Sequence, residues 1–223
     1  VAWGDRDGDG LLDLAVGGGD PASEPVYVFD GIGAAPWLAS AASWQTAGGS
    51  HGTSGAWADE DGDGLLDLAV ATVSNEATSV FRSDLANGLS TTAAWSSTDD
   101  DGFDSRELAW GDISGDGAPE LLEATYGASA PVNRSDLLRA NTGYAPLPPT
   151  TIDFLPGVGG SLGDVDGDGD LDLLVAGSAA PSRLYLNDGQ GGFGFDANVG
   201  PSDSYADADW ADADGDGDND AVL

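Results

Sequence analysis

The sequence predicts an all-β protein, a partial β-propeller built from four-stranded blades. Three observations lead to this prediction. An acidic, glycine-rich frame of nine residues occurs five times, with its first aspartate at Asp5, Asp59, Asp112, Asp164 and Asp212. Short apolar runs flank the frames, and no stretch of about ten residues shows helical periodicity. A repeat of about 50 residues with four short strands is typical of a propeller blade.

Each repeat follows the same order of segments. A strand such as 55–57 leads into the frame, and a Val- and Leu-rich strand such as 67–70 leaves it. Runs of this length and composition predict buried strands, so the frame is the turn of a β-hairpin. We expect the third and fourth strands of the repeats at 25–29 and 43–46, 79–82 and 92–95, 131–134 and 151–154, and 182–186 and 193–195.

The period also sets the domain organisation. We expect one propeller domain, or a fragment of one, over residues 1–223, with blades at 1–50, 51–104, 105–156, 157–204 and 205–223. The fifth repeat stops after its second strand. Because a closed ring needs complete blades, we expect the chain to be part of a longer protein. A four-bladed ring is the alternative, whereas a solenoid of nonapeptide calcium repeats has a far shorter period.

The acidic frame is a candidate Ca²⁺ site. In a tight loop, positions 1, 3 and 5 direct oxygens to one centre, position 7 adds a backbone carbonyl, and position 9 adds a last carboxylate. This all-oxygen set suits Ca²⁺, because Zn²⁺ prefers Cys and His, and the chain has no Cys and one His. Two carboxylates about 5 Å apart repel by roughly 3 kcal/mol at an effective dielectric near 20. One such frame could be a solvated turn, but five in register favour bound cations.

The five frames, named loops one to five, predict up to five Ca²⁺ ions. The predicted ligands are Asp5, Asp7, Asp9, Leu11 and Asp13 in loop one; Asp59, Asp61, Asp63, Leu65 and Asp67 in loop two; Asp112, Ser114, Asp116, Ala118 and Glu120 in loop three; Asp164, Asp166, Asp168, Asp170 and Asp172 in loop four; and Asp212, Asp214, Asp216, Asp218 and Asp220 in loop five. Loop three departs from the pattern at Ser114 and Glu120. Its smaller charge predicts the weakest Ca²⁺ binding of the five.

The charge of the chain narrows the classes of partner. The formal net charge is -34 at pH 7, from 40 acidic residues and 6 Lys and Arg. Nucleic acids and anionic membranes need a basic surface, so we expect neither as a partner. No apolar run approaches the roughly 20 residues of a membrane-spanning helix. Because weak Ca²⁺ sites are typical of extracellular modules, we expect a secreted or cell-surface protein.

The frame and its surroundings resemble FG-GAP and VCBS repeats. The similarity lies in the pattern Trp-Gly-Asp-x-Asp-Gly-Asp-Gly-x-x-Asp-Leu-x-Val and in residues 183–189, and it covers essentially the whole chain. The resemblance implies a propeller like that of the integrin α-subunit, with Ca²⁺ bound in the hairpin between the first two strands of a blade. It also implies adhesion or ligand binding outside the cell. Some relatives carry the propeller on an enzyme such as a polysaccharide lyase.

Together these observations predict a calcium-stabilised binding or adhesion scaffold that recognises a protein or a glycan. Two alternatives stay open. The chain could be the propeller part of a secreted polysaccharide-degrading enzyme, catalytic or not, or a self-associating module of a surface fibre. We expect no enzymatic activity, because the candidates His51, Tyr126 and Arg134 are scattered. Gly-x-Ser-x-Gly occurs at Ser50 and Ser161, but neither match has the following helix that a nucleophile elbow needs.

Aromatic residues mark a fixed position in the repeats. Tryptophan lies two residues before the first loop acid at Trp3, Trp57, Trp110 and Trp210, and Leu162 takes this place in repeat four. Burial is the ordinary use of a large aromatic ring. We therefore expect these residues to pack between adjacent blades, with a ring of ligand-stacking side chains as the alternative.

Overall fold

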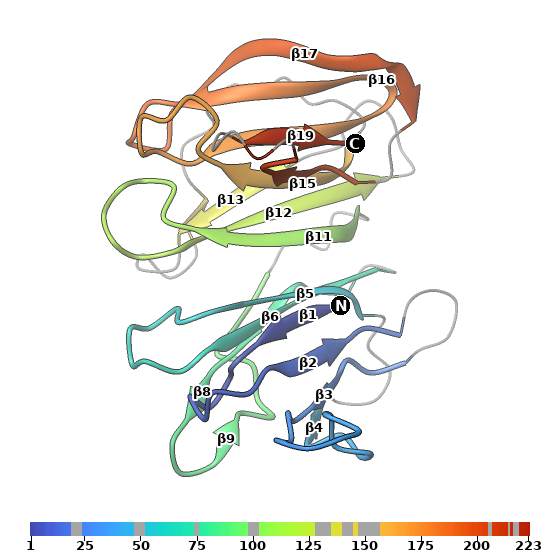
Figure 1. Ribbon diagram of the computed structural model, residues 1–223, viewed down its shortest axis with the longest axis vertical. Helices are drawn as coiled ribbons and strands as arrows, with labels where there is room; N and C mark the ends of the chain where they lie inside the picture. Colours follow the sequence, from blue (N-terminus) through green and yellow to red (C-terminus); the bar gives the residue numbers. More distant parts are fainter. Residues whose placement is uncertain are drawn as a thin grey trace. The chain divides into compact units, whose positions relative to one another are not determined.

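The protein is all-β, as predicted. The computed structural model describes residues 1–18, 24–46, 52–73, 76–97, 103–127, 135–139, 145–146, 157–204, 207–213, 215 and 219–223. Every regular element in these residues is a β-strand (Figure 1). No helix of the described residues is long and apolar enough to cross a membrane. The chain forms two compact units, Val1–Leu108 and Ala109–Leu223, and each is described by itself.

Repeat one folds into one antiparallel sheet in the N-terminal unit. The strands β1 (Ala2–Gly4), β2 (Asp13–Val16), β3 (Tyr27–Phe29) and β4 (Trp44–Gln45) lie side by side in chain order. Loop one joins β1 to β2, and Gly4 pairs with Asp13 at the base of this hairpin. This simple up-and-down order is the arrangement expected within a propeller blade.

Repeat two forms a second sheet in the same unit. It consists of β5 (Gly52–Ala58), β6 (Asp67–Thr72), β7 (Ser79–Phe81) and β10 (Trp95–Ser96), with loop two between β5 and β6. A small hairpin of β8 (Ser83–Asp84) and β9 (Gly88–Leu89) lies between the third and fourth strands. This hairpin was not predicted, because its two-residue strands carry no periodic signal.

The C-terminal unit contains the sheets of repeats three to five. Repeat three is built from β11 (Phe103–Gly111), β12 (Glu120–Gly127), β13 (Ser135–Arg139) and β14 (Ala145–Pro146). Repeat four is built from β15 (Gly157–Gly163), β16 (Asp172–Asn187) and β17 (Phe193–Ser204), and repeat five from β18 (Asp209–Ala211) and β19 (Asp220–Val222). The strands predicted at 131–134 and 151–154 lie outside the described residues.

The long strand β16 contains two predicted strands. Its first part pairs with β15, and its last part pairs with β17. The backbone N–H of Asn187 donates to Oδ1 of Asp172 at 2.9 Å, although these residues are the two ends of β16. The chain therefore reverses within β16, and its two arms are the predicted second and third strands.

Each unit has its own apolar core. In the N-terminal unit, Val28, Leu68 and Val70 from neighbouring sheets pack in one buried cluster. In the C-terminal unit, Leu173 and Tyr185 of β16 belong to a cluster that includes the loop residue Ile113. The buried strands that follow the acidic loops thus hold the loops on a fixed base.

The residue two positions before each loop packs as predicted at three places, whereas the prediction is wrong for Trp3, which is 54% exposed. Trp57 lies against Gly4, and Trp210 lies against Gly163, so closely that a Cβ on either glycine would meet the tryptophan ring. Leu162 lies similarly close to Gly111. Trp57 Nε1 also donates to the carbonyl of Ala2. Glycine permits this close approach of neighbouring repeats. Closure of the repeats into a ring, and the blade boundaries, remain predictions.

Candidate metal centre

The first carboxylate of each acidic loop organises the turn. Asp5 accepts the N–H of Asp9 on Oδ1 (3.0 Å) and that of Gly10 on Oδ2 (2.9 Å). The N–H of the sixth-position glycine bonds to the first acid in the same way in loops two, three and four. Gly10 has φ +85°, which residues with a side chain rarely adopt. The recurring glycine is therefore a backbone requirement of the loop.

The carboxylate at position five of the loop accepts a backbone N–H from two residues farther along. Oδ1 of Asp9 accepts the N–H of Leu11 at 2.8 Å. Asp63 does the same with Leu65 at 2.9 Å. The equivalent bonds recur at Asp116 in loop three and Asp168 in loop four. These local bonds engage one oxygen of each fifth-position acid and tighten the turn.

In loops one, two and four, the carboxylate at position nine is buried and clamps the loop to the third strand. Asp67, with no exposed surface, accepts the N–H of Glu60 on Oδ2 (3.0 Å) and that of Ser83 on Oδ1 (2.8 Å). The donors are the second loop residue and a residue just after the third strand. The same pair of bonds occurs at Asp13 and Asp172. Sequence reasoning treated this acid as a ligand alone and missed the clamp.

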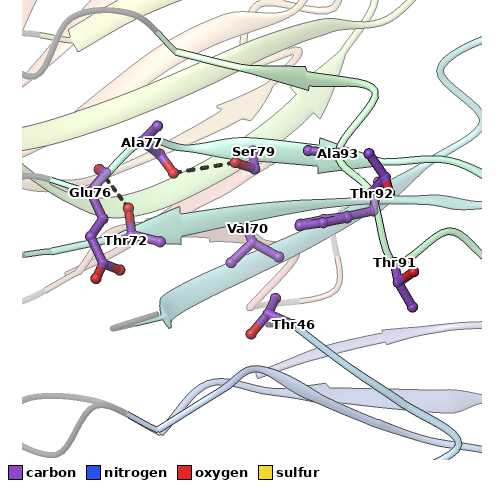
Figure 2. Close-up of a pocket in the computed structure, with 10 residues that line it drawn as sticks. Thr46, Val70, Thr72, Glu76, Ala77, Ser79, Thr91, Thr92 and Ala93 are labelled. Atoms are coloured by element: carbon purple, nitrogen blue, oxygen red, sulfur yellow. Dashed lines mark hydrogen bonds between the residues drawn. The ribbon is translucent and has the colours of Figure 1, made fainter. Parts of the chain in front are cut away.

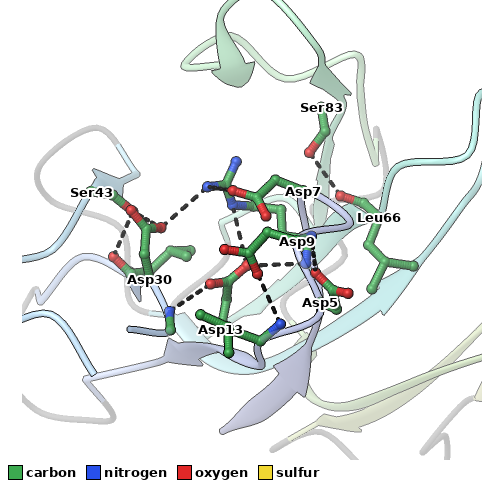
Figure 3. Close-up of polar contacts among 12 residues, drawn as sticks. Asp5, Asp7, Asp9, Asp13, Asp30, Ser43, Leu66 and Ser83 are labelled. Carbon is green, nitrogen blue, oxygen red and sulfur yellow. Dashed lines mark hydrogen bonds and ion pairs between the residues drawn. The ribbon is translucent and has the colours of Figure 1, made fainter. Parts of the chain in front are cut away.

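Three loops bring carboxylates close enough to share one cation. In loop one, one oxygen from each of Asp5, Asp7 and Asp9 lies within 4.8 Å of the others, and Figure 3 shows these side chains together at the β1–β2 turn. Equivalent trios are Asp59, Asp61 and Asp67, and Asp164, Asp166 and Asp172. Such a set of hard oxygen donors fits Ca²⁺, which takes six to eight oxygens in flexible geometry.

Burial raises the pKa of several loop acids. Burial raises the pKa of Asp67 to about 6, although the hydrogen bonds that it accepts from Ser83 and Glu60 lower the pKa. Burial also raises the pKa of Asp166, and the nearby charge of Asp168 adds to the rise. A bound cation would favour the ionised form of these acids.

We expect the Asp67 carboxyl to titrate near pH 6 in calcium-free protein. Its folded pKa lies above the ordinary 3.8, so the part of its stability contribution that comes from proton uptake is complete below pH 3.8 and is lost as the pH rises through 6. Carbon-detected NMR of the aspartate carboxyls, in excess chelator, measures the midpoint. Asp84 is the internal control, because hydrogen bonds from Asn87 lower its pKa. A midpoint for Asp67 at or below 4 would contradict the effect of burial.

Loop three has a different internal geometry. Oε2 of the buried Glu120 accepts the N–H groups of Ile113 and Ser114, both at 2.9 Å. The Ser114 hydroxyl donates to Oε1 of Glu120 at 3.1 Å. The longer glutamate thus folds back onto the loop, and the serine that replaces the third aspartate bonds to it. Loop three, although fully described, is not among the three loops with a carboxylate trio.

Loop three is therefore expected to bind Ca²⁺ most weakly and to lose it first. Its acids are fewer, and affinity follows the number of charged ligands. A Ca²⁺ titration followed at the amides of the sixth-position glycines, including Gly117, reports each loop separately. Ser114→Asp should strengthen site three by restoring the missing charge. If site three keeps its ion after loops one, two and four have emptied, the charge argument is wrong.

Loop five is described only in part. Asp212 accepts the N–H of Gly215 at 2.7 Å, and Asp220 accepts that of Ala213 at 2.9 Å. The second bond is the loop half of the ninth-position clamp. The predicted ligands Asp214, Asp216 and Asp218 lie outside the described residues.

Comparison with protein families agrees with the repeated loop geometry. The family model for the FG-GAP-like repeat matches residues 5–70 and 164–223, which is more than half of the chain. The chain belongs to the FG-GAP-like repeat family. The matched segments of this FG-GAP-like protein contain loops one, two, four and five, whereas loop three lies between them. A search of curated proteins gave no match.

The FG-GAP-like protein also has a pocket on repeat two. Its volume is about 370 Å³, and Val70 of β6 and Phe81 of β7 are its buried apolar residues. Figure 2 shows Thr46, Thr72 and Thr92 around Val70, with Glu76 at one end. Glu76 is the charged residue of the lining.

Three of the candidate catalytic residues have no described side chain. His51 and Arg134 lie outside the described residues, and the side chain of Tyr126 is not described. Ser161 lies in the middle of strand β15, and its hydroxyl donates to Asp209 at 3.3 Å. A nucleophile elbow needs a sharp turn between a strand and a helix, so the match at Ser161 is not one.

Proposed function

We propose that this FG-GAP-like chain is a calcium-stabilised scaffold that binds a partner outside the cell. The observation that carries the proposal is the convergence of three carboxylates in each of loops one, two and four. Asp13, Asp67 and Asp172 also clamp their loops to the third strands. An ion bound at such a loop would join the first, second and third strands of a repeat.

The connections between third and fourth strands offer a variable edge for a partner. In repeat one this connection carries Trp37, which is 66% exposed and has φ +76°. In repeat two it carries the β8–β9 hairpin with the exposed Leu85. In repeat four a short turn from Asn187 to Gly192 closes the same connection. Rigid sheets with variable loops are a common basis for binding.

The pocket on repeat two favours a neutral glycan as the partner. The apolar faces of Val70 and Phe81 suit the C–H face of a sugar ring, and threonine hydroxyls and the Glu76 carboxylate can bond to its hydroxyls. The single charge in the lining is negative, so an anionic sugar is disfavoured. The volume is within the usual range for ligand pockets, about 300–1,000 Å³.

A glycan array tests this assignment. We expect the calcium-loaded protein to bind neutral glycans and Ala93→Trp, which fills the pocket, to lose that binding. Val222→Trp places the same ring at an exposed position of β19, outside the pocket lining and the strand connections, and serves as the matched control. Undiminished binding by Ala93→Trp, or no glycan bound by the wild type, would contradict a glycan site here.

An enzyme and a fibre module are the competing functions. A depolymerisation assay on neutral polysaccharides distinguishes the enzyme, and sedimentation at rising protein concentration distinguishes the self-associating module. We expect neither turnover nor concentration-dependent assembly. Turnover by the purified chain would overturn the proposal of a non-catalytic scaffold.

A further inference from the structure

Two positions in the repeats form a charged pair beside the acidic loop. In repeat one, Nη2 of Arg6 donates to Oδ1 of Asp30 at 3.2 Å. In repeat two, Nε and Nη2 of Arg82 donate to the two carboxylate oxygens of Glu60 at 2.7 and 2.9 Å. Arg6 and Glu60 are the second residues of their loops, whereas Asp30 and Arg82 directly follow the third strand. The two repeats therefore use the same positions with the charges exchanged.

Both arrangements place a guanidinium next to the carboxylate at position three of the loop. Nη2 of Arg6 lies 3.7 Å from Oδ2 of Asp7, and Nε of Arg82 lies 3.5 Å from Oδ2 of Asp61. Nε of Arg6 also lies 3.9 Å from Oδ2 of the ninth acid Asp13. Figure 3 shows Asp7, Asp13 and Asp30 close together in this part of repeat one.

These contacts are shielded from water in part. The Arg6 and Asp7 side chains are 10% and 47% exposed, and those of Arg82 and Asp61 are 44% and 28% exposed. Charge interactions at such sites are screened less by solvent and salt than those of exposed pairs. The guanidinium thus acts on the loop acids at short range.

Repeat four has no charge at these two positions. Val165 is the second residue of loop four, and Leu186, near the end of β16, directly precedes Asn187, whose N–H is the second donor of the clamp. The equivalence is fixed by the clamp, because Asp172 accepts the N–H of Val165 and that of Asn187, the residue after Leu186. Loop four therefore has the same carboxylate trio as loop two, with no arginine at either of these two positions.

We propose that Arg6 and Arg82 are positioning residues that serve as internal counter-cations for loops one and two. A guanidinium that pairs with the third carboxylate offsets carboxylate repulsion when the metal is absent. It also competes with the metal for the same oxygen. Loops one and two consequently keep their shape without Ca²⁺ and bind it more weakly, whereas loop four depends on the ion most. This inference rests on the proposal that the loops bind Ca²⁺.

An exchange of the pairs between repeats two and four tests the inference. Glu60→Val with Arg82→Leu gives repeat two the apolar pair of repeat four, and Val165→Glu with Leu186→Arg gives the reverse. Both double variants keep the net charge of the chain, so any change in binding is local. We expect Ca²⁺ affinity at loop two to rise about tenfold in the first variant and that at loop four to fall about tenfold in the second.

Site-resolved titrations at the amides of Gly64 and Gly169 measure the Ca²⁺ affinities of loops two and four. Hydrogen exchange of the loop amides in excess chelator measures how well each loop keeps its structure without the ion. We expect the exchange protection of empty loop two to fall in the first variant and that of empty loop four to rise in the second. Arg82→Lys should keep the wild-type affinity in part, because the charge remains and the two-point pairing is lost.

Two results separate failure of this inference from failure of the proposed function. If the wild type binds Ca²⁺ at loops two and four, and both folded double variants keep its affinities, the counter-cation role is wrong. If the repeat-two variant does not fold, the repeat-four variant decides alone, since it removes no buried ion pair. If the wild type binds no Ca²⁺ at all, the proposed function and this inference are both overturned.

Discussion

Removal of Ca²⁺ is expected to lower the melting temperature of this chain by roughly 10 °C. At a tenfold excess over its dissociation constant, a ligand that binds only the folded state adds about 1.4 kcal/mol per site. The three loops with convergent carboxylates together add about 4 kcal/mol, which is a large part of a typical domain stability of about 5–15 kcal/mol. Calorimetry in Ca²⁺ and in excess chelator, at equal ionic strength, measures the difference.

Matched substitutions show whether the loops cause this shift. Asp59→Asn removes one charge from a carboxylate trio, and we expect it to reduce the shift by about a third. Asp84→Asn removes the same charge on the β8–β9 hairpin and should leave the shift unchanged. Superimposed melting curves with and without chelator would contradict a stabilising role of the metal.

Asp67→Ala is expected to destabilise the N-terminal unit by about 3–5 kcal/mol even without Ca²⁺. The fully buried carboxylate accepts N–H groups from Glu60 and Ser83, and each donor loses a buried partner in the variant. Leaving a buried donor unsatisfied costs about 1–3 kcal/mol, and bonds to charged groups are at the upper end. Urea unfolding in chelator at pH 8, above the pKa of about 6, measures the clamp alone.

Asp63→Ala is the control for the clamp. Asp63 belongs to the same loop, but it is exposed and accepts the N–H of Leu65, a bond within the loop. We expect it to cost less than about 1 kcal/mol in chelator. Equal losses for Asp63→Ala and Asp67→Ala would show that the ninth acid has no special structural role.

The local parts of the fold could be predicted from the sequence. Loop one has its carboxylates and glycines at spacings set by bonds over two to five residues, as from Asp5 to Gly10. The strand after loop two was predicted at 67–70, and β6 begins at the same residue, Asp67, because a short apolar run follows the loop directly. The packing of Trp57 against Gly4 followed from its recurring position.

Features that join distant segments could not be predicted. The second partner of the Asp67 clamp, Ser83, is a backbone N–H and leaves no mark in the residue type. The pairs at Arg6 and Arg82 share positions but not residues, since the charges are exchanged between repeats. Their equivalence is visible only once the third strand is in register. Closure into a ring depends on contacts between repeats that the composition of one repeat does not specify.

A count of bound ions shows whether the acidic loops hold Ca²⁺. The protein is dialysed against millimolar Ca²⁺ at physiological ionic strength, and total calcium per chain is measured by elemental analysis against the dialysate. The account predicts at least three ions per chain, and a loss of one ion for each of Asp5→Asn, Asp59→Asn and Asp164→Asn. No calcium above the dialysate, or a count that these three substitutions leave unchanged, would contradict it.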